Sequence, residues 1–362
     1  MTGGVVHVVV AGEVGGAERM LVDLATDSRR AHSIALLTPS DRLRALFRDA
    51  GLDVDDRGPV REGPLSYLGS TLGARDVVWI AGVIAKRRAA IVHLHTFASQ
   101  VVGTRAAGRS RARVVRTEHS SRVYDDPSCW PFSRWSLARA DAVVCISEHV
   151  KRVAMARAPW AAAKMSVVPN GVDIAHFTAA GTGTGMGRGE LLRFVSLGRL
   201  DRRKGLDIAL GALALVPGAA LDIVGDGDER ASLVELASRL GVSDRVRFLG
   251  FVADVRGAIA NADVALSSAR SEGLGIALLE AMAMDRAVVA LPTGGVPEIV
   301  ADGDTGWLAH GHGAEALARV MQDAVDRPDE VRRRGARARA SVETRFSIEA
   351  MRRGYERVYD TL

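Results

Sequence analysis

The stretch Ser271-Glu272-Gly273-Leu274-Gly275-Ile276-Ala277-Leu278-Leu279-Glu280-Ala281-Met282-Ala283 decides the fold. It follows the apolar run 263–268, which is short and β-branched and predicts a buried strand that ends at Ser267 or Ser268. The stretch therefore begins as a loop. It continues as a mostly apolar helix, which we expect to pack against a sheet on one side and to be covered on others.

Two glutamates interrupt this apolar pattern. Glu280 lies inside the helix, where a carboxylate is costly to bury without a partner. Glu272 precedes the helix, and a rise of about 1.5 Å per residue separates the two by roughly 12 Å, more than the ~5–9.5 Å of a glycosidase pair. The separation suits one elongated ligand held at two points, with a phosphate on the N–H groups bared at Gly273 and Gly275. The alternative is a buried helix with Glu272 as its N-terminal acid and Glu280 in a salt bridge.

At these residues the sequence resembles the retaining, nucleotide-sugar-dependent glycosyltransferases of family 4 (group 1), whose motif is Glu, seven residues, Glu. The resemblance implies an α/β fold of the GT-B type, with two facing Rossmann-like domains and an interdomain cleft. It also implies that Glu272 approaches the donor sugar and that Glu280 holds the ribose hydroxyls. Gly273, Leu274, Gly275 and Ile276 would bind the donor diphosphate.

A basic segment follows the run 192–198, which predicts a strand that presents Arg199. Lys204 is expected at the start of the next helix, where two cations would form a clamp for a diphosphate. Both residues match the family's Gly-Arg-Leu to Lys-Gly motif, which implies that they neutralise the leaving diphosphate. The alternative is an exposed basic loop that also contains Arg202 and Arg203.

The start of the chain, Val5 to Val10, reads as a buried parallel strand, followed by a glycine loop and a helix. This order suggests a ligand site at the end of the strand, although the spacing is not Gly-x-Gly-x-x-Gly. The segment from Gly15 to Glu18 resembles the family's first glycine loop, which places Gly16 near the donor diphosphate and Gly15 near the acceptor. A plain tight turn is the alternative.

Histidines end two further predicted strands, at His93-Leu94-His95 and at His119. His-x-His alone is weak evidence for a metal, and because no third ligand has the proper spacing, the sequence predicts no metal site. The resemblance implies that His119 lies beside the donor sugar and takes part in catalysis. His95 is the second choice, as an acceptor-binding residue.

The segment 121–135 is expected to be a loop that forms the acceptor wall. It offers Tyr124, Asp125 and Trp130, which can stack on a polar ring or hydrogen-bond to it.

Strand and helix patterns alternate through the rest of the first half, as expected of an open α/β domain. The predicted strands are 33–37, 91–95, 114–117 and 142–146, and the predicted helices are 42–50, 75–88, 98–108 and 148–157. Residues 52–72 are expected to form an irregular connection, and they contain no recognisable motif. A glycine-rich linker is expected at 179–187, directly after the family's Pro-Asn-Gly-Val-Asp segment.

These patterns divide the chain into three parts. We expect an acceptor-binding Rossmann-like domain over 1–180 and a nucleotide-sugar-binding Rossmann-like domain over 190–345. A C-terminal helix over 346–362 would, by resemblance, cross back to the first domain. The length of 362 residues and the 48% apolar content suffice for two cores.

Composition limits the classes of protein. No apolar run reaches the ~20 residues of a membrane span and the first residues lack a signal peptide, so we expect a cytoplasmic protein. Cys129 and Cys145 are expected to be reduced thiols. Residues 1–180 contain 24 Lys and Arg against 17 Asp and Glu, giving +7, and the remainder contains 24 against 26, giving −2. This asymmetry allows a peripheral membrane contact, while 5% aromatic residues argue against nucleic-acid binding.

The sequence thus favours a retaining hexosyltransferase that moves a sugar from a nucleotide-diphosphate sugar to a hydroxyl. A UDP-sugar is favoured and GDP-mannose is the other candidate, with a small-molecule, lipid-linked or glycan acceptor. No cofactor beyond the co-substrate is expected. The alternatives are a non-catalytic partner subunit or a sugar-nucleotide epimerase of the same fold. A Rossmann dehydrogenase is disfavoured because both halves lack the dinucleotide fingerprint.

Overall fold

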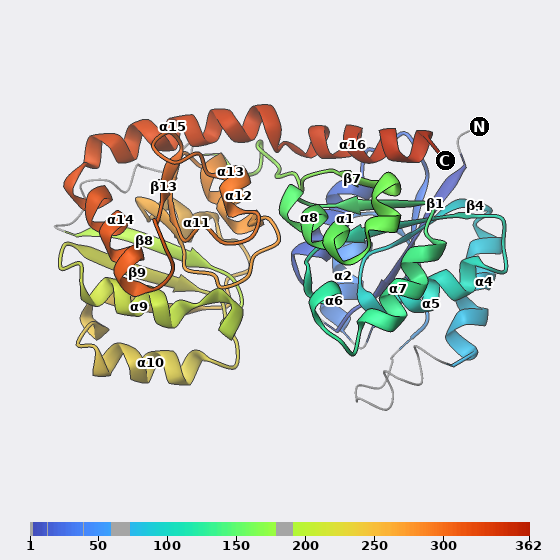
Figure 1. Cartoon of the computed structure of the whole chain (residues 1–362), viewed down its shortest axis with the longest axis horizontal. Helices are drawn as coiled ribbons and strands as arrows, with labels where there is room; N and C mark the ends of the chain where they lie inside the picture. The colour runs from blue at the N-terminus through green and yellow to red at the C-terminus, as the bar shows by residue number, and fades with distance from the viewer. Residues whose placement is uncertain (1–2, 13, 39, 59–72, 179–190) are drawn as a thin grey trace. The chain divides into compact units, whose positions relative to one another are not determined.

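The computed structural model describes residues 3–12, 14–38, 40–58, 73–178 and 191–362. The chain forms two compact units (Figure 1). The N-terminal unit comprises Met1–Asn170 together with Met351–Leu362, and the C-terminal unit comprises Gly171–Ala350. The division after Asn170 precedes the linker expected at 179–187, which lies outside the described residues.

The N-terminal unit is built on a parallel sheet with the strand order β3-β2-β1-β4-β5-β6-β7. Its strands are β1 (Gly4–Val10), β2 (His32–Leu37), β3 (Asp53–Asp56), β4 (Ala89–Leu94), β5 (Arg113–Glu118), β6 (Ala142–Cys145) and β7 (Met165–Val167). The central strands are buried, as their runs of Val and Ile require. The connection direction reverses between β1 and β4, which is where open α/β sheets bind ligands.

Helices cover this sheet (Figure 1). They are α1 (Gly16–Ala25), α2 (Asp41–Asp49), α4 (Arg75–Lys86), α5 (Phe97–Ala107), α6 (Arg122–Asp125), α7 (Trp130–Arg139), α8 (Glu148–Arg157) and the 3₁₀ helix η1 (Pro159–Lys164). The last helix, α16 (Ile348–Asp360), returns to this unit from the far end of the chain. Its Met351, Tyr355 and Tyr359 join Val5 and Met20 in one buried cluster.

The C-terminal unit has a parallel sheet of the same design, with the order β10-β9-β8-β11-β12-β13. Its strands are β8 (Leu192–Leu197), β9 (Ala219–Val224), β10 (Val246–Gly250), β11 (Val264–Ser267), β12 (Ala287–Ala290) and β13 (Gly306–Leu308). The helical segments are η2 (Arg202–Lys204), α9 (Leu206–Ala214), α10 (Arg230–Arg239), η3 (Ser243–Arg245), α11 (Arg256–Ala260), α12 (Ile276–Ala283), α13 (Val296–Ile299), α14 (Ala314–Asp326) and α15 (Pro328–Arg345). The direction reverses between β8 and β11.

The predicted α/β class is confirmed, and each predicted strand and helix of the first half is present with ends shifted by at most two residues. Three predictions were wrong. Residues 53–56 form β3, an acidic edge strand whose Asp residues hide the usual apolar pattern, and residues 59–72 of that connection lie outside the described residues. The expected loop 121–135 contains α6 and the first part of α7, over residues 130–135. Pro131 lies in the first turn of α7, where proline is well tolerated. Lys204 ends the 3₁₀ turn η2 and does not start α9.

Candidate active site

An ion pair joins the two connections that follow the central strands of the C-terminal sheet. Lys204 comes after β8 and Glu272 after β11, so both lie at the carboxyl edge where the strand order reverses. The Lys204 Nζ donates to Glu272 Oε2 at 2.7 Å. The two side chains are 30% and 19% exposed, so the pair remains within reach of a ligand.

Glycines bring these connections into close contact. Gly294, after β12, has a φ of +61°, and a Cβ atom there would lie 1.8 Å from the backbone oxygen of Glu272. Gly205 has a φ of +60°, and its Cβ would lie 2.2 Å from the backbone oxygen of Ser268. The backbones that carry Lys204 and Glu272 therefore pack at distances that only glycine permits.

Helix α12 begins beside the ion pair. Its N-cap is Gly275, with a φ of +106°, and within the described residues no side chain caps it. The first N–H groups of a helix lack an intrahelical partner, so this terminus can bind an anion. A small pocket reaches it, lined by Ser196, Lys204, Ser268, Glu272, Gly275 and Leu278 among others.

The other residues predicted to bind the donor nucleotide sugar differ in their exposure. Arg199 is exposed in the connection between β8 and η2, and Glu280 is half-buried in the middle of α12. Leu274 is 1% exposed, so its side chain belongs to the core and it could meet a ligand through its backbone alone. Gly273 and Ile276 are half-buried at the start of the helix.

The glycine loop of the N-terminal unit leads into α1. Gly15 is the N-cap of this helix, and both Gly15 and Gly16 are exposed. The Gly15 N–H donates to Glu18 Oε2 at 2.9 Å. Burial raises the pKa of the Glu18 carboxyl. An acidic side chain of the same helix therefore already occupies part of this N-terminus.

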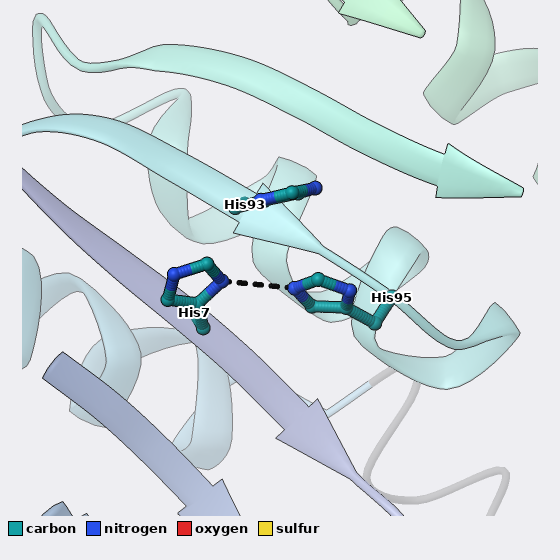
Figure 2. A group of neighbouring side chains, drawn as sticks. All are labelled: His7, His93 and His95. Atoms are coloured by element: carbon teal, nitrogen blue, oxygen red, sulfur yellow. Dashed lines mark hydrogen bonds between the residues drawn. The ribbon is translucent and has the colours of Figure 1, made fainter. Parts of the chain in front are cut away.

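A cluster of histidines lies on the central strands of the N-terminal sheet, toward their carboxyl ends. His7 of β1 pairs in register with His93 of β4, and His95 follows β4 directly (Figure 2). His7, His93 and His95 offer ligand atoms within 4.8 Å of one another, so a third histidine lies beside the His-x-His pair although none has the proper spacing in sequence. The third one comes from a neighbouring strand, which spacing along the chain does not reveal.

Hydrogen bonds extend this cluster in two directions. His7 Nδ1 lies 2.9 Å from His95 Nε2, and His7 Nε2 lies 2.7 Å from His32 Nδ1. His95 Nδ1 lies 3.4 Å from Nε2 of His119, the predicted catalytic histidine. Burial lowers the pKa of His7, His93 and His95 well below the usual value. Burial also lowers the pKa of His32 and of His119 to about 4, so the whole group is neutral at pH 7.

The three acceptor residues expected in the segment 121–135 are not equally accessible. Asp125 is exposed and Trp130 is half-buried, with the Arg157 guanidinium 5.0 Å from its ring centroid. Tyr124 is only 3% exposed and packs 5.9 Å from the Trp130 ring, measured between centroids. Burial raises the pKa of the Tyr124 phenol. Tyr124 therefore lies in the core, where it packs against Trp130.

Of the helices in the described parts of the chain, none combines the length and apolar composition that a membrane span requires.

Comparison with known protein families adds a description of each half. Residues 188–341 match the model of "Glycosyl transferases group 1", and residues 14–176 match that of "Glycosyltransferase Family 4". The first match contains Arg199, Lys204 and the segment from Glu272 to Glu280, and the second contains the glycine loop and His119.

Two curated relatives illustrate the range of similarity. The lipopolysaccharide core biosynthesis glycosyltransferase LpsE of Rhizobium meliloti is 34% identical over 188 residues, which cover 50% of this chain and 55% of that protein. A GDP-mannose-dependent α-(1-6)-phosphatidylinositol monomannoside mannosyltransferase of Mycobacterium tuberculosis is 30% identical over 346 residues, covering 89% of this chain and 88% of that protein. The chain spans about half the length of the first of these and most of the second.

A solved structure establishes the fold. Anabaena HepE in complex with UDP superimposes with a TM-score of 0.85 at 22% identity, covering 99% of this chain and 100% of that one.

Proposed function

The chain belongs to the glycosyltransferases of group 1, family 4, and from that premise we propose that it transfers a sugar from a nucleotide-diphosphate sugar to a hydroxyl, with retention of configuration. The observation that carries the proposal is the ion pair between Lys204 and Glu272 beside the N-terminus of α12. An ammonium group and a helix N-terminus suit a diphosphate, and a carboxylate suits sugar hydroxyls.

Each residue then has a role in the transfer. Lys204, Arg199 and the start of α12 stabilise the charge that develops on the departing diphosphate, usually the largest contribution in such chemistry. Glu272 orients the donor sugar, Glu280 holds the ribose, and His119 contacts the donor sugar. Gly15, Asp125 and Trp130 belong to the acceptor side. His95 is 5% exposed and both of its ring nitrogens face other histidines, so it acts through His119 and does not bind the acceptor itself.

We propose that configuration is retained without a covalent intermediate on the protein. The Glu272 carboxylate is already paired with Lys204, which makes it a poor candidate for attack on the sugar. The acceptor hydroxyl then attacks from the side of the leaving group, and a diphosphate oxygen takes its proton. The bond between the anomeric carbon and the diphosphate oxygen breaks as the bond to the acceptor oxygen forms.

A UDP-sugar is the favoured donor, because the structurally similar Anabaena protein was solved with UDP and with UDP-glucose. The Mycobacterium tuberculosis relative is named for GDP-mannose, which makes that the second donor to test. The positive charge at the site comes from side chains, so we propose that no metal cofactor is needed. A chelator should leave turnover unchanged.

A donor screen tests the function. The purified protein is incubated with UDP-, GDP- and TDP-sugars, and its thermal shift and its slow hydrolysis of each donor are measured with Glu280→Ala alongside. One donor should stabilise the wild type and be hydrolysed slowly, with a weaker response from the variant. The configuration of the product, read by NMR at the anomeric proton, tests retention. A shift with NAD(H) and with no nucleotide sugar would refute the proposal.

A further inference from the structure

We infer that Glu356, on the returning helix α16, sets the position of the protons along a chain of buried histidines that ends at His119. This inference rests on the proposed function, because it gives His119 a defined tautomer at the site assigned to it there. All the groups involved lie in the N-terminal unit.

The chain is continuous through hydrogen bonds. Glu356 Oε1 accepts from the Ser28 hydroxyl at 2.8 Å, and Ser28 Oγ lies 2.9 Å from His32 Nε2. His32, His7, His95 and His119 follow, joined at 2.7, 2.9 and 3.4 Å. Every histidine inside the chain uses both ring nitrogens, so each proton position constrains the next.

The Glu356 carboxylate determines which atom of each hydrogen bond carries the proton. Glu356 forms an ion pair with Arg30 at 3.0 Å, with both side chains about one-tenth exposed or less, which keeps the carboxylate ionised. An ionised carboxylate only accepts, so Ser28 donates its single proton to Glu356. The Ser28 oxygen accepts from the Arg30 backbone N–H at 3.3 Å and has one lone pair left. His32 must therefore carry its proton on Nε2 and donate it to Ser28.

The remaining tautomers follow one by one, because a neutral imidazole carries a single proton. His32 Nδ1 bears no proton, so it accepts from His7 Nε2–H. His7 Nδ1 then accepts from His95 Nε2–H, and His95 Nδ1 accepts from His119 Nε2–H. His119 is left with an unprotonated Nδ1. Burial, which lowers the pKa of these histidines, keeps each of them in the neutral form that the argument requires.

The consequence is that His119 offers the sugar site an acceptor nitrogen. In the opposite tautomer Nδ1–H would be a donor. A ligand hydroxyl that donates to Nδ1 would then have to rotate and accept instead. Glu356, Ser28 and the three internal histidines are thus positioning residues, which act through His119.

A metal ion is the competing explanation for so many neutral histidines. Two observations favour hydrogen bonds. His93 has both ring nitrogens at 2.7 Å from hydroxyl groups, those of Tyr359 and Thr117. His7 and His95 point ring nitrogens directly at each other at hydrogen-bond distance (Figure 2), where a metal would have to separate them.

Tautomers can be read directly by NMR of the ligand-free protein labelled with ¹⁵N at histidine, because two-bond couplings identify which ring nitrogen carries the proton. His119→Gln assigns the signals. In the wild type His119 should be protonated on Nε2. In Ser28→Ala, and independently in Glu356→Gln, His119 should lose this single tautomer and show a population protonated on Nδ1.

Asp360→Asn is the matched control. Asp360 lies on the same helix and pairs with the same Arg30, yet it is not part of the chain, so this variant should keep the wild-type tautomers. In the Ser28 and Glu356 variants, kcat for transfer should fall about tenfold or more while KM for the donor is unchanged.

Three results would overturn the inference. They are a His119 protonated on Nδ1 in the wild type, an unchanged tautomer in both variants, and stoichiometric zinc in the purified protein that His7→Ala removes. If the tautomer responds and kcat does not, the chain is supported and the role of His119 in the proposed function is refuted.

Discussion

Lys204 and Glu272 illustrate how a short motif specifies a site at the scale of single residues. They are separated by 68 positions in sequence, yet they form one ion pair, because each lies in the connection that follows a central strand of the same parallel sheet. The sequence predicts both residues through their motifs. It does not predict that they contact each other, since contact depends on glycine-mediated packing between the two connections.

Removing the Lys204 ammonium should impair the chemical step. We expect Lys204→Ala to lower kcat/KM by about 100-fold or more, because charge on the departing diphosphate loses a preorganised cation. Steady-state kinetics with the donor found in the screen measure this loss. Arg239→Ala, which breaks an exposed ion pair on α10, is the control and should leave kinetics unchanged. Near-normal turnover of Lys204→Ala would contradict the assignment.

Gly294 and Gly303 form a matched pair for the packing argument. Both have positive φ, +61° and +77°, but a Cβ at Gly294 meets the Glu272 backbone at 1.8 Å while one at Gly303 meets nothing within 4 Å. Gly303→Ala should cost about 1 kcal/mol of backbone strain. Gly294→Ala should cost more than about 3 kcal/mol and weaken donor binding. Urea unfolding gives both values, and equal costs would show that the close approach is unimportant.

The histidine cluster shows where residue-level prediction fails. His93 and His95 are visible as a pair in the sequence, and nothing along the chain connects them to His7 or His32. Parallel register creates the connection by placing His7 opposite His93. Such contacts can be predicted only when the order of the strands in the sheet is known.

At the scale of elements, hydrophobic patterning identifies the buried strands and amphipathic helices well. It misses β3, whose sequence Asp-Val-Asp-Asp lacks an apolar run, because an edge strand is stabilised here by ion pairs such as that of Asp55 with Arg87. It also misses α6 and α7, which are rich in residues that also suit loops. Short or polar elements depend on their neighbours more than on their own composition.

Helix α16 should be essential to the core that it enters. Tyr355 is fully buried, and its hydroxyl lies 3.1 Å from Thr117 Oγ1. Tyr355→Ala should lower the free energy of unfolding by about 3–5 kcal/mol, since it leaves a cavity of aromatic size. Arg353→Ala, at an exposed position of the same helix, should change it by less than about 0.5 kcal/mol. A small effect at Tyr355 would mean that the helix is only loosely attached.

At the scale of the whole molecule, the two units should respond differently to acid. His32 and His119 have pKa values of about 4 in the folded protein against 6.5 in the unfolded chain. Below pH 6.5 the unfolded state binds more protons. The free energy of unfolding of the N-terminal unit should therefore fall by roughly 1.4 kcal/mol per pH unit for each such histidine down to pH 4.

Tryptophan fluorescence can follow this unit alone. In a Trp307→Phe variant the remaining tryptophans, Trp79, Trp130, Trp135 and Trp160, all lie in the N-terminal unit. Its urea midpoint should be lower at pH 5 than at pH 7, a range in which most carboxylates do not titrate. The histidines of the C-terminal unit are exposed, so hydrogen exchange of its strands, corrected for intrinsic rates, should change little. Equal midpoints for the N-terminal unit would contradict the prediction.

The return of α16 has a consequence for synthesis on the ribosome. Tyr355 and Tyr359 leave the exit tunnel only after the whole of Gly171–Ala350 has been translated. Until then the buried cluster of the N-terminal sheet lacks Met351, Tyr355 and Tyr359, although Met20 and Leu24 of α1 already contribute to it. The nascent N-terminal unit therefore keeps part of its apolar core exposed until synthesis is nearly complete, and we expect chaperones to bind it during that time.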